Sequence, residues 1–104
     1  VMRALEFIRR HATDRITSAD VIAVMGCRRS CAYQRFRACL GHTILEEIRS
    51  RRIARVKELL RGGDHDLASL PDYCGFSSLV DLRRVFKAET GRTLTQWREK
   101  SQRT

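Results

Sequence analysis

The sequence is poor in helix-breaking residues and has no long apolar run. It contains a single proline and six glycines among 104 residues, a scarcity typical of a helical protein with short turns. No apolar run approaches the ~20 residues that a membrane-spanning helix requires, and the first residues lack the pattern of a signal peptide. We therefore expect an all-α protein without a membrane partner, located in the cytoplasm.

The sequence also lacks the spacing of a metal site and the residue sets of an enzyme. Its cysteines form no Cys-x-x-Cys pair, and no histidine stands near them at the usual zinc spacing. We expect reduced, mostly buried thiols, with no metal and no cofactor; the four are Cys27, Cys31, Cys39 and Cys74. No carboxylate pair, nucleophile–base set or phosphate-binding loop is recognisable, so no enzymatic activity is predicted.

Acidic residues are missing from one stretch of a chain that is basic as a whole. Lys and Arg number 21 against 12 Asp and Glu, which gives a net charge of +9. No acidic residue lies between Asp20 and Glu46, and the same stretch contains Arg28, Arg29, Arg35 and Arg37. A merely solvated helix face usually alternates charge sign. The pattern therefore favours a polyanionic partner, a nucleic acid first and an acidic membrane surface second.

Apolar periodicity predicts seven helices. Hydrophobic residues make up 42% of the chain, enough for a packed core. The expected helices cover 2–12, 17–26, 29–39, 44–60, 67–74 and 79–89, and a last one begins near Thr95. Thr17 and Asp20 form a capping-box pattern, and Gly26 ends the helix that follows. The polar face of 44–60 is expected to hold Arg49, Arg51, Arg52 and Arg55.

The two halves of the sequence repeat one unit. Residues 36–44, FRACLGHTI, return fifty residues later as FKAETGRTL, residues 86–94, and Gly26 is matched by Gly75. Each unit has a helix that ends in glycine, a short turn, and a helix that is half apolar and half basic, which is the pattern of a helix-turn-helix. We predict a first subdomain at 1–43, a linker helix at 44–61 and a second subdomain at 62–104.

The periodicity of the two repeated helices assigns an inward and an outward face to each. Ala32, Phe36 and Leu40 are expected to face the core in the first, and Leu82 and Phe86 in the second. The outward side of the first then presents Arg29, Ser30, Tyr33, Gln34 and Arg37. That of the second presents Leu79, Val80, Arg83, Arg84 and Lys87.

These residues resemble the DNA-binding domain of the AraC/XylS family of bacterial transcription regulators over essentially the whole chain. The resemblance is carried by Phe36…Gly41-His42-Thr43, Arg52…Leu59-Leu60, Cys74-Gly75-Phe76-Ser77-Ser78, and Phe86-Lys87…Gly91…Thr93 followed by Trp97-Arg98. Residues 7–17, FIRRHATDRIT, are also similar to the xylose-operon regulators of that family.

The resemblance implies seven helices, with two recognition helices entering successive major grooves on one side of the DNA. By position, the recognition helices cover 28–39 and 78–89. The base-contacting positions of the family fall on Ser30, Tyr33, Gln34, Leu79, Val80 and Arg84. The resemblance further implies RNA polymerase as a partner and a separate sensing or dimerisation domain that is missing from this chain. The protein would then be nucleoid-associated.

Two departures from the family pattern affect helix starts. The family usually has a capping serine where Arg28 stands, so we expect Ser30 to cap instead and to shorten the first recognition helix by a turn. Pro71 replaces the usual alanine, and a proline inside a helix costs about 3 kcal/mol. We therefore expect that helix to start late, with Ser69 as its cap and Pro71 in the first turn.

Side-chain chemistry divides the candidate residues into two groups. Arg84, Arg29 and Arg83 suit guanine, Gln34 suits adenine, and Leu79 and Val80 suit thymine methyl groups, with core packing as the alternative for both apolar residues. Tyr33 and Ser30 complete the base-contacting set, with a phosphate contact as the alternative for Tyr33. Contacts to the DNA backbone are expected from Arg28, Arg37, Thr43, Ser77, Ser78 and Lys87.

Two other functions remain open from the sequence. One is a basic RNA-binding or nucleoid protein without sequence preference, which would give no reason for the repeat or for Gln34. The other is a helical adaptor for an acidic protein partner, whose binding would survive DNA competitor. Sequence-specific binding of double-stranded DNA is the prediction that uses both the repeat and the charge.

Overall fold

The computed structural model describes residues 1–62 and 66–102 of the chain and shows only helices there. The seven α-helices are α1 Met2–His11, α2 Ser18–Met25, α3 Arg29–Leu40, α4 Ile44–Gly62, α5 Leu70–Cys74, α6 Leu79–Thr90 and α7 Leu94–Gln102. Two single-turn 3₁₀ helices are added, η1 at Ala12–Asp14 and η2 at Leu67–Ser69. The predicted all-α, seven-helix fold is confirmed.

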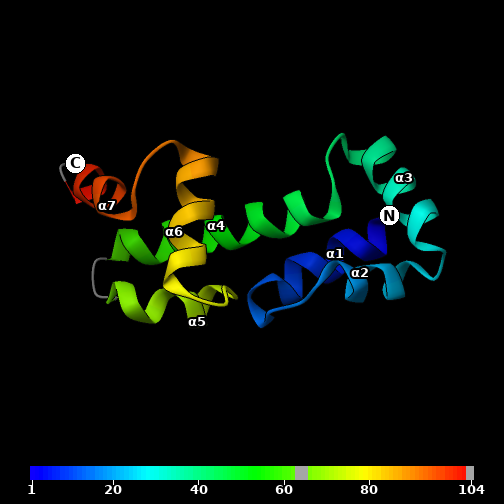
Figure 1. Ribbon diagram of the computed structural model, residues 1–104, viewed down its shortest axis with the longest axis horizontal. Helices are drawn as coiled ribbons and strands as arrows, with labels where there is room; N and C mark the ends of the chain where they lie inside the picture. Colours follow the sequence, from blue (N-terminus) through cyan, green and yellow to red (C-terminus); the bar gives the residue numbers. More distant parts are fainter. Residues whose placement is uncertain (63–65, 103–104) are drawn as a thin grey trace.

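Helix α4 runs along the long axis of an elongated molecule that measures 45 × 23 × 21 Å (Figure 1). Helices α1, α2 and α3 lie at one end of it, and α5, α6 and α7 at the other. Within the described residues, none of the helices combines the length and the apolar character needed to cross a membrane.

The apolar residues form two cores, one at each end of α4. The N-terminal core consists of Ala4, Ile8, Ala12, Val21, Phe36, Ile44 and Ile48. The C-terminal core consists of Ile53, Val56, Leu59, Leu60, Leu70, Cys74, Phe76, Leu82, Val85, Phe86 and Leu94. Because α4 contributes side chains to both, it orients one core relative to the other.

Local signals in the sequence set several helix ends as predicted. Thr17 Oγ1 accepts a hydrogen bond from Asp20 N–H (3.4 Å), and Asp20 Oδ2 accepts one from Thr17 N–H (2.8 Å), which completes the capping box of α2. Gly26 ends α2 in the left-handed conformation, with φ at 68°. The last helix begins at Leu94, one residue before Thr95, because Thr93 Oγ1 accepts from Gln96 N–H (3.2 Å).

The start of α3 at residue 29, predicted from periodicity, is confirmed, but the expectation that Ser30 caps and shortens this helix was wrong. The helix begins at Arg29, directly after Arg28, and keeps 12 residues; Ser30 lies within it and is not its cap. No side chain caps this end among the described residues. Burial of Ala32 and Phe36 in the N-terminal part of the protein stabilises the helix instead, since tertiary packing contributes more to helix stability than a cap does.

Helix α5 starts late, as Pro71 predicted. Ser69 occupies the N-cap position and Pro71 lies in the first turn. However, the Ser69 hydroxyl does not cap the helix: it donates a hydrogen bond to the carbonyl oxygen of Asp66 (2.8 Å). The fixed φ of proline suits a first helical turn, so the backbone conformation, rather than a serine cap, sets this start.

The expectation of mostly buried thiols was also wrong. Only Cys74 is buried, Cys27 and Cys31 are half-buried, and Cys39 is exposed. Burial raises the pKa of the Cys74 thiol to about 11, so this side chain remains a neutral, apolar part of the core.

Candidate nucleic-acid interface

Helices α3 and α6 are equivalent parts of the repeated unit, and they are separated along the molecule (Figure 1). Each has 12 residues and ends at a glycine in the left-handed conformation, Gly41 with φ at 78° and Gly91 with φ at 76°. Phe36 and Phe86 are fully buried on their inward faces. Each helix therefore offers one face for a partner while the other face fixes it to a core.

The candidate residues of the first helix divide by exposure. Five of them are exposed and form a basic and polar surface: Arg28, Arg29, Ser30, Gln34 and Arg37. Tyr33 is half-buried and packs against the N-terminal core. Thr43 is half-buried as well, and its Oγ1 accepts a hydrogen bond from Glu46 N–H (3.1 Å). The structure therefore gives Tyr33 and Thr43 contacts within the protein.

The second helix shows a similar division. The exposed candidates are Ser77, Ser78, Val80, Arg83, Arg84 and Lys87. Leu79 is partly buried and packs against the C-terminal core, whereas the Val80 side chain is 76% exposed. The core-packing alternative therefore applies to Leu79, and Val80 is the apolar side chain presented outward.

Asp81 is a residue that the sequence analysis did not single out. Arg84 Nη2 donates to Asp81 Oδ1 (2.7 Å), one helical turn away, and Asp81 N–H donates to Ser78 Oγ (3.1 Å). An acid three residues before a base on a helix face is a signal that could have revealed this ion pair. The strongest candidate for a guanine contact is thus held by a carboxylate of its own helix.

Arg52 was expected on the polar face of α4 but instead bridges the two halves. Its Nε donates to the carbonyl oxygen of Ala12 (2.7 Å), and its Nη2 to that of Ile16 (2.8 Å). The guanidinium also lies over the Phe76 ring, 5.9 Å from its centroid. Partial burial lowers the Arg52 pKa, but an arginine stays charged at any physiological pH.

Gly75 brings the backbones of the two halves into direct contact. Its φ is 84°, and a Cβ on this residue would stand 2.7 Å from the carbonyl oxygen of Ala12 and 2.9 Å from Thr13 Cα. Nearby, Arg15 Nη2 lies 2.6 Å from Asp72 Oδ1 in an exposed ion pair. We call the contacts of Arg52 with Ala12, Ile16 and Phe76, together with the close approach of Gly75 to Ala12, the joint. It fixes α3 and α6 relative to each other.

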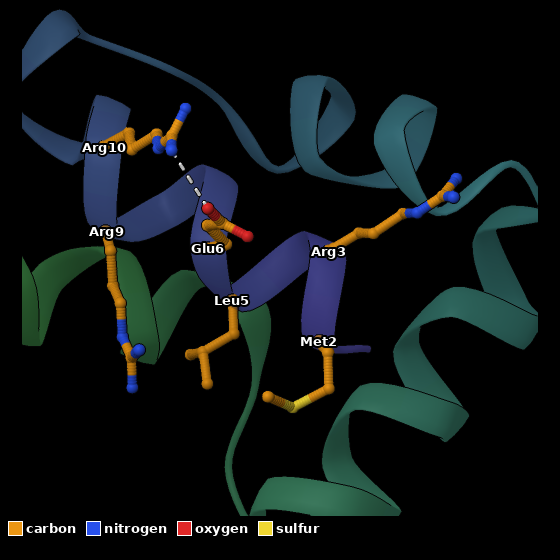
Figure 2. A pocket seen from close by; sticks show the side chains of 6 residues that line it. All are labelled: Met2, Arg3, Leu5, Glu6, Arg9 and Arg10. Atoms are coloured by element: carbon orange, nitrogen blue, oxygen red, sulfur yellow. Dashed lines mark ion pairs between the residues drawn. The ribbon is translucent and has the colours of Figure 1, made fainter.

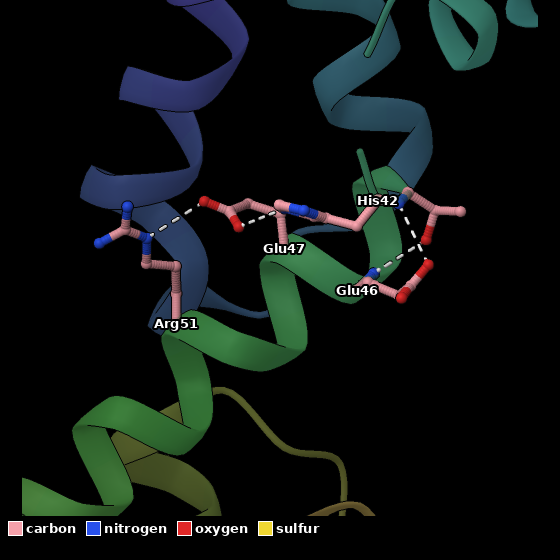
Figure 3. A network of polar contacts seen from close by, with 5 residues as sticks. His42, Glu46, Glu47 and Arg51 are labelled. Carbon is pink, nitrogen blue, oxygen red and sulfur yellow. Dashed lines mark hydrogen bonds and ion pairs between the residues drawn. The ribbon is translucent and has the colours of Figure 1, made fainter. Parts of the chain in front are cut away.

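A second network holds the turn between α3 and α4 (Figure 3). His42 Nε2 lies 2.8 Å from Glu47 Oε2, and Arg51 Nε lies 3.4 Å from Glu47 Oε1. Beside it, Glu46 Oε1 accepts from Thr43 N–H (3.1 Å), and the hydrogen bonds with Thr43 hold the pKa of Glu46 below its usual value of 4.5. Polar and charged side chains therefore hold the turn that follows α3.

Elsewhere on the surface, a pocket lies along α1 (Figure 2). It is lined by residues of that helix alone, and Arg10 and Glu6 pair across it (3.1 Å). Small-molecule sites usually collect polar groups from several elements, so this pocket does not have the usual make-up of a ligand site.

Within residues 1–62 and 66–102, no three His, Cys, Asp or Glu side chains gather as ligands of a metal would.

Comparison with known proteins supplies the family. The family model described as "Helix-turn-helix domain" matches residues 21–100. The chain is 32% identical over 98 residues to the xylose operon regulatory protein of Haemophilus influenzae, covering 94% of this chain and 25% of that protein.

Two solved structures are also similar. The xylose-binding transcription activator xylR superposes with a TM-score of 0.74 at 27% identity, over 92% of this chain and 25% of that one. The DNA-binding domain of AdpA, a global transcriptional factor, in complex with a target DNA has the same fold. Its TM-score is 0.88 at 22% identity, with 94% of this chain and 88% of that one covered.

The chain thus spans about a quarter of the length of the curated relatives it matches. The family match covers both repeated units, and it agrees with the seven helices and the two exposed basic helix faces. The proteins that support this family assignment are transcription regulators, not enzymes. The chain belongs to the helix-turn-helix domain family, as a DNA-binding domain of the AraC/XylS type of transcription regulator.

Proposed function

We propose that this domain reads two adjacent segments of one DNA duplex, with α3 and α6 in successive major grooves on the same side. The observation that carries this proposal is the joint: two equivalent, half-exposed basic helices are held on one frame 45 Å long. Successive major grooves on one side of B-DNA recur about every 34 Å. The molecule is therefore long enough to span both.

The proposed division of labour follows exposure and chemistry. Base edges are contacted by exposed residues of each helix, with Arg84, Arg29 and Arg83 suited to guanine and Gln34 to adenine. Val80 suits a thymine methyl group. Ser30 completes the exposed set, while Tyr33 and Leu79 can offer only the parts of their side chains that are not packed on a core.

Contacts to the DNA backbone set the position of the two helices. Arg28, Arg37 and Lys87 supply the charge for phosphate contacts. Ser77, Ser78 and Thr43 complete the proposed backbone-contacting set, the last two with hydroxyls that also cap helices. We also propose the division into subdomains 1–43 and 62–104 around the linker 44–61, since each would carry one reading helix.

The relatives suggest where such a domain acts. A xylose operon regulatory protein and a protein named as an HTH-type transcriptional activator are among them. We infer that this chain is part of a longer bacterial regulator with a sensing or dimerisation domain, and that it acts with RNA polymerase at the chromosome in the cytoplasm. The share of the relatives' length that the chain covers, about a quarter, supports this.

The test is selection of bound duplexes from a random pool, with random RNA as competitor. We expect enrichment of a motif in two parts whose centres are about 10 base pairs apart. Binding without an enriched motif would favour a nucleoid-type protein and overturn the proposal. Loss of DNA binding, with capture of an acidic protein that DNA does not displace, would favour the adaptor.

A further inference from the structure

The first turn of α6 contains a carboxylate where the proposed function needs positive charge. Asp81 and Glu89 are the acidic residues of this helix, and only Asp81 lies at its start. The N-terminal residues of a recognition helix are those that reach base edges. A carboxylate there repels the phosphates on both sides of the groove and so lowers affinity for every duplex. Its presence in this helix therefore points to a second role that offsets this loss.

The Asp81 carboxylate forms an ion pair with Arg84, and its charge also partly offsets the burial that lowers the pKa of Arg52. Its Oδ1 lies 2.7 Å from Arg84 Nη2, a short, charge-assisted contact. The Asp81 side chain is 31% exposed and that of Arg84 65%, so the carboxylate lies closer to the protein and the guanidinium further out. Asp81 thus binds Arg84 on the protein side and leaves the outer part of the guanidinium exposed.

This contact leaves Arg84 able to read a base. A guanidinium is planar and has five N–H donors, of which the pair with Asp81 uses one. Holding one nitrogen restricts the plane of the whole group. The remaining donors can still form the bidentate contact with guanine O6 and N7.

We propose that Asp81 is a positioning residue for DNA recognition: it fixes Arg84 for guanine and reduces binding to other sequences. This inference depends on the proposed function. The first recognition helix has no such pair, because fifty residues earlier the equivalent positions hold Cys31 and Gln34. Preorganised guanine reading is therefore a property of the second helix.

The test compares the 104-residue wild-type chain with Asp81→Asn. Both are put through selection from a random duplex pool, and binding is then measured on the selected duplex, on duplexes changed at each guanine, and on random duplex. We expect the variant to lose about fivefold in preference at one guanine position, the one that Arg84→Ala also relaxes. We also expect it to bind random duplex more tightly, by about threefold at low salt.

Two controls separate positioning from charge and from folding. Glu89→Gln removes one negative charge from the same helix, near its other end, and should leave the base preference unchanged. The hydrogen bond to Ser78 uses the Asp81 backbone N–H, which asparagine keeps, so helix content by circular dichroism should not change.

The double variant Asp81→Asn/Arg84→Ala tests the coupling. If Asp81 acts through Arg84, the double variant should show the same base preference as Arg84→Ala alone. A further loss in the double variant would overturn the proposal, as would an unchanged preference in Asp81→Asn. A wild-type chain that enriches no motif would overturn the proposed function and this inference with it.

Discussion

In the second half of the molecule Ser78 caps α6, and its hydroxyl accepts a hydrogen bond from Asp81 N–H, whereas in the first half Arg28 precedes α3 without a side-chain cap. The turns that follow the two helices differ as well. After α3, Glu46 completes the capping box with Thr43, and after α6, the neutral Gln96 does so with Thr93. Equivalent backbones are thus held by charged side chains in one half and largely by neutral ones in the other.

The same contrast appears in the packing beneath the helices. His42 pairs with the buried Glu47 in the first half. In the second half Trp97 stands at the position equivalent to Glu47 and packs edge-to-face on Phe86, with ring centroids 5.9 Å apart. We expect the first unit to respond to salt and, through the lowered pKa of Glu46, to pH, and the second unit mainly to changes in packing.

The largest effect is expected at the glycine that ends the first helix of the second unit. Gly75→Ala places a methyl group 2.7 Å from the Ala12 carbonyl oxygen in a left-handed backbone. It should cost about 3–5 kcal/mol in the free energy of unfolding, measured by urea denaturation. The matched Gly26→Ala has the same backbone strain but open space around it, and should cost about 1–2 kcal/mol. Equal losses would show that Gly75 is not in close contact.

Arg52→Met tests the other component of the joint. The variant keeps most of the side-chain volume but leaves the carbonyl groups of Ala12 and Ile16 without their donor. We expect a loss of about 2–3 kcal/mol in unfolding free energy. Arg55→Met, on an exposed arginine of the same helix, is the control and should change little. If the two variants behaved alike, the bridge would contribute nothing to stability.

Changing the N-cap residues of α3 and α6 should reduce the difference in stability between the two helix starts. Ser78→Ala removes the cap of α6 and should cost about 1 kcal/mol. Arg28→Ser gives α3 a cap and should add about 0.5–1 kcal/mol in thermal or chemical denaturation, while weakening DNA binding if Arg28 contacts phosphate. A gain in stability with no change in the salt dependence of binding would remove Arg28 from the interface.

The smallest effect concerns pH. Because the folded state lowers the Glu46 pKa, its ionised form stabilises the protein above the usual value of 4.5, and this contribution is lost as pH falls through the lowered pKa. Glu46→Gln keeps an acceptor for Thr43 N–H but does not titrate, so it should lose less stability than wild type on acidification. Gln96→Glu should introduce the same acid sensitivity into the second unit. Unfolding curves at neutral and acidic pH give the comparison.

Features carried by neighbouring residues were predictable from the sequence. The Thr17–Asp20 capping box, the glycine ends, and the inward positions of Phe36 and Phe86 depend on spacings of a few residues. The proposed reading faces follow from the same periodicity, and most of the candidate residues are indeed exposed.

Features that depend on distant residues were missed. Arg52 looks like one more arginine on a polar face, but its acceptors lie 40 and 36 residues away, and no local pattern indicates them. The expected shortening of α3 by a Ser30 cap was wrong, because burial of Ala32 and Phe36 holds the first turns of this helix without a side-chain cap. The Asp81–Arg84 ion pair is a local feature that was also missed, although an acid three residues before a base on one helix indicates it.

The joint has a mechanical consequence for the DNA. A protein frame held by Arg52 and Gly75 resists bending, so a duplex that meets both α3 and α6 has to adapt its own curvature. Bending a site of 20–30 base pairs costs roughly 1–6 kcal/mol, depending on the stiffness of its sequence. We therefore expect the base pairs between the two contacted segments to contribute to the choice of site through their flexibility.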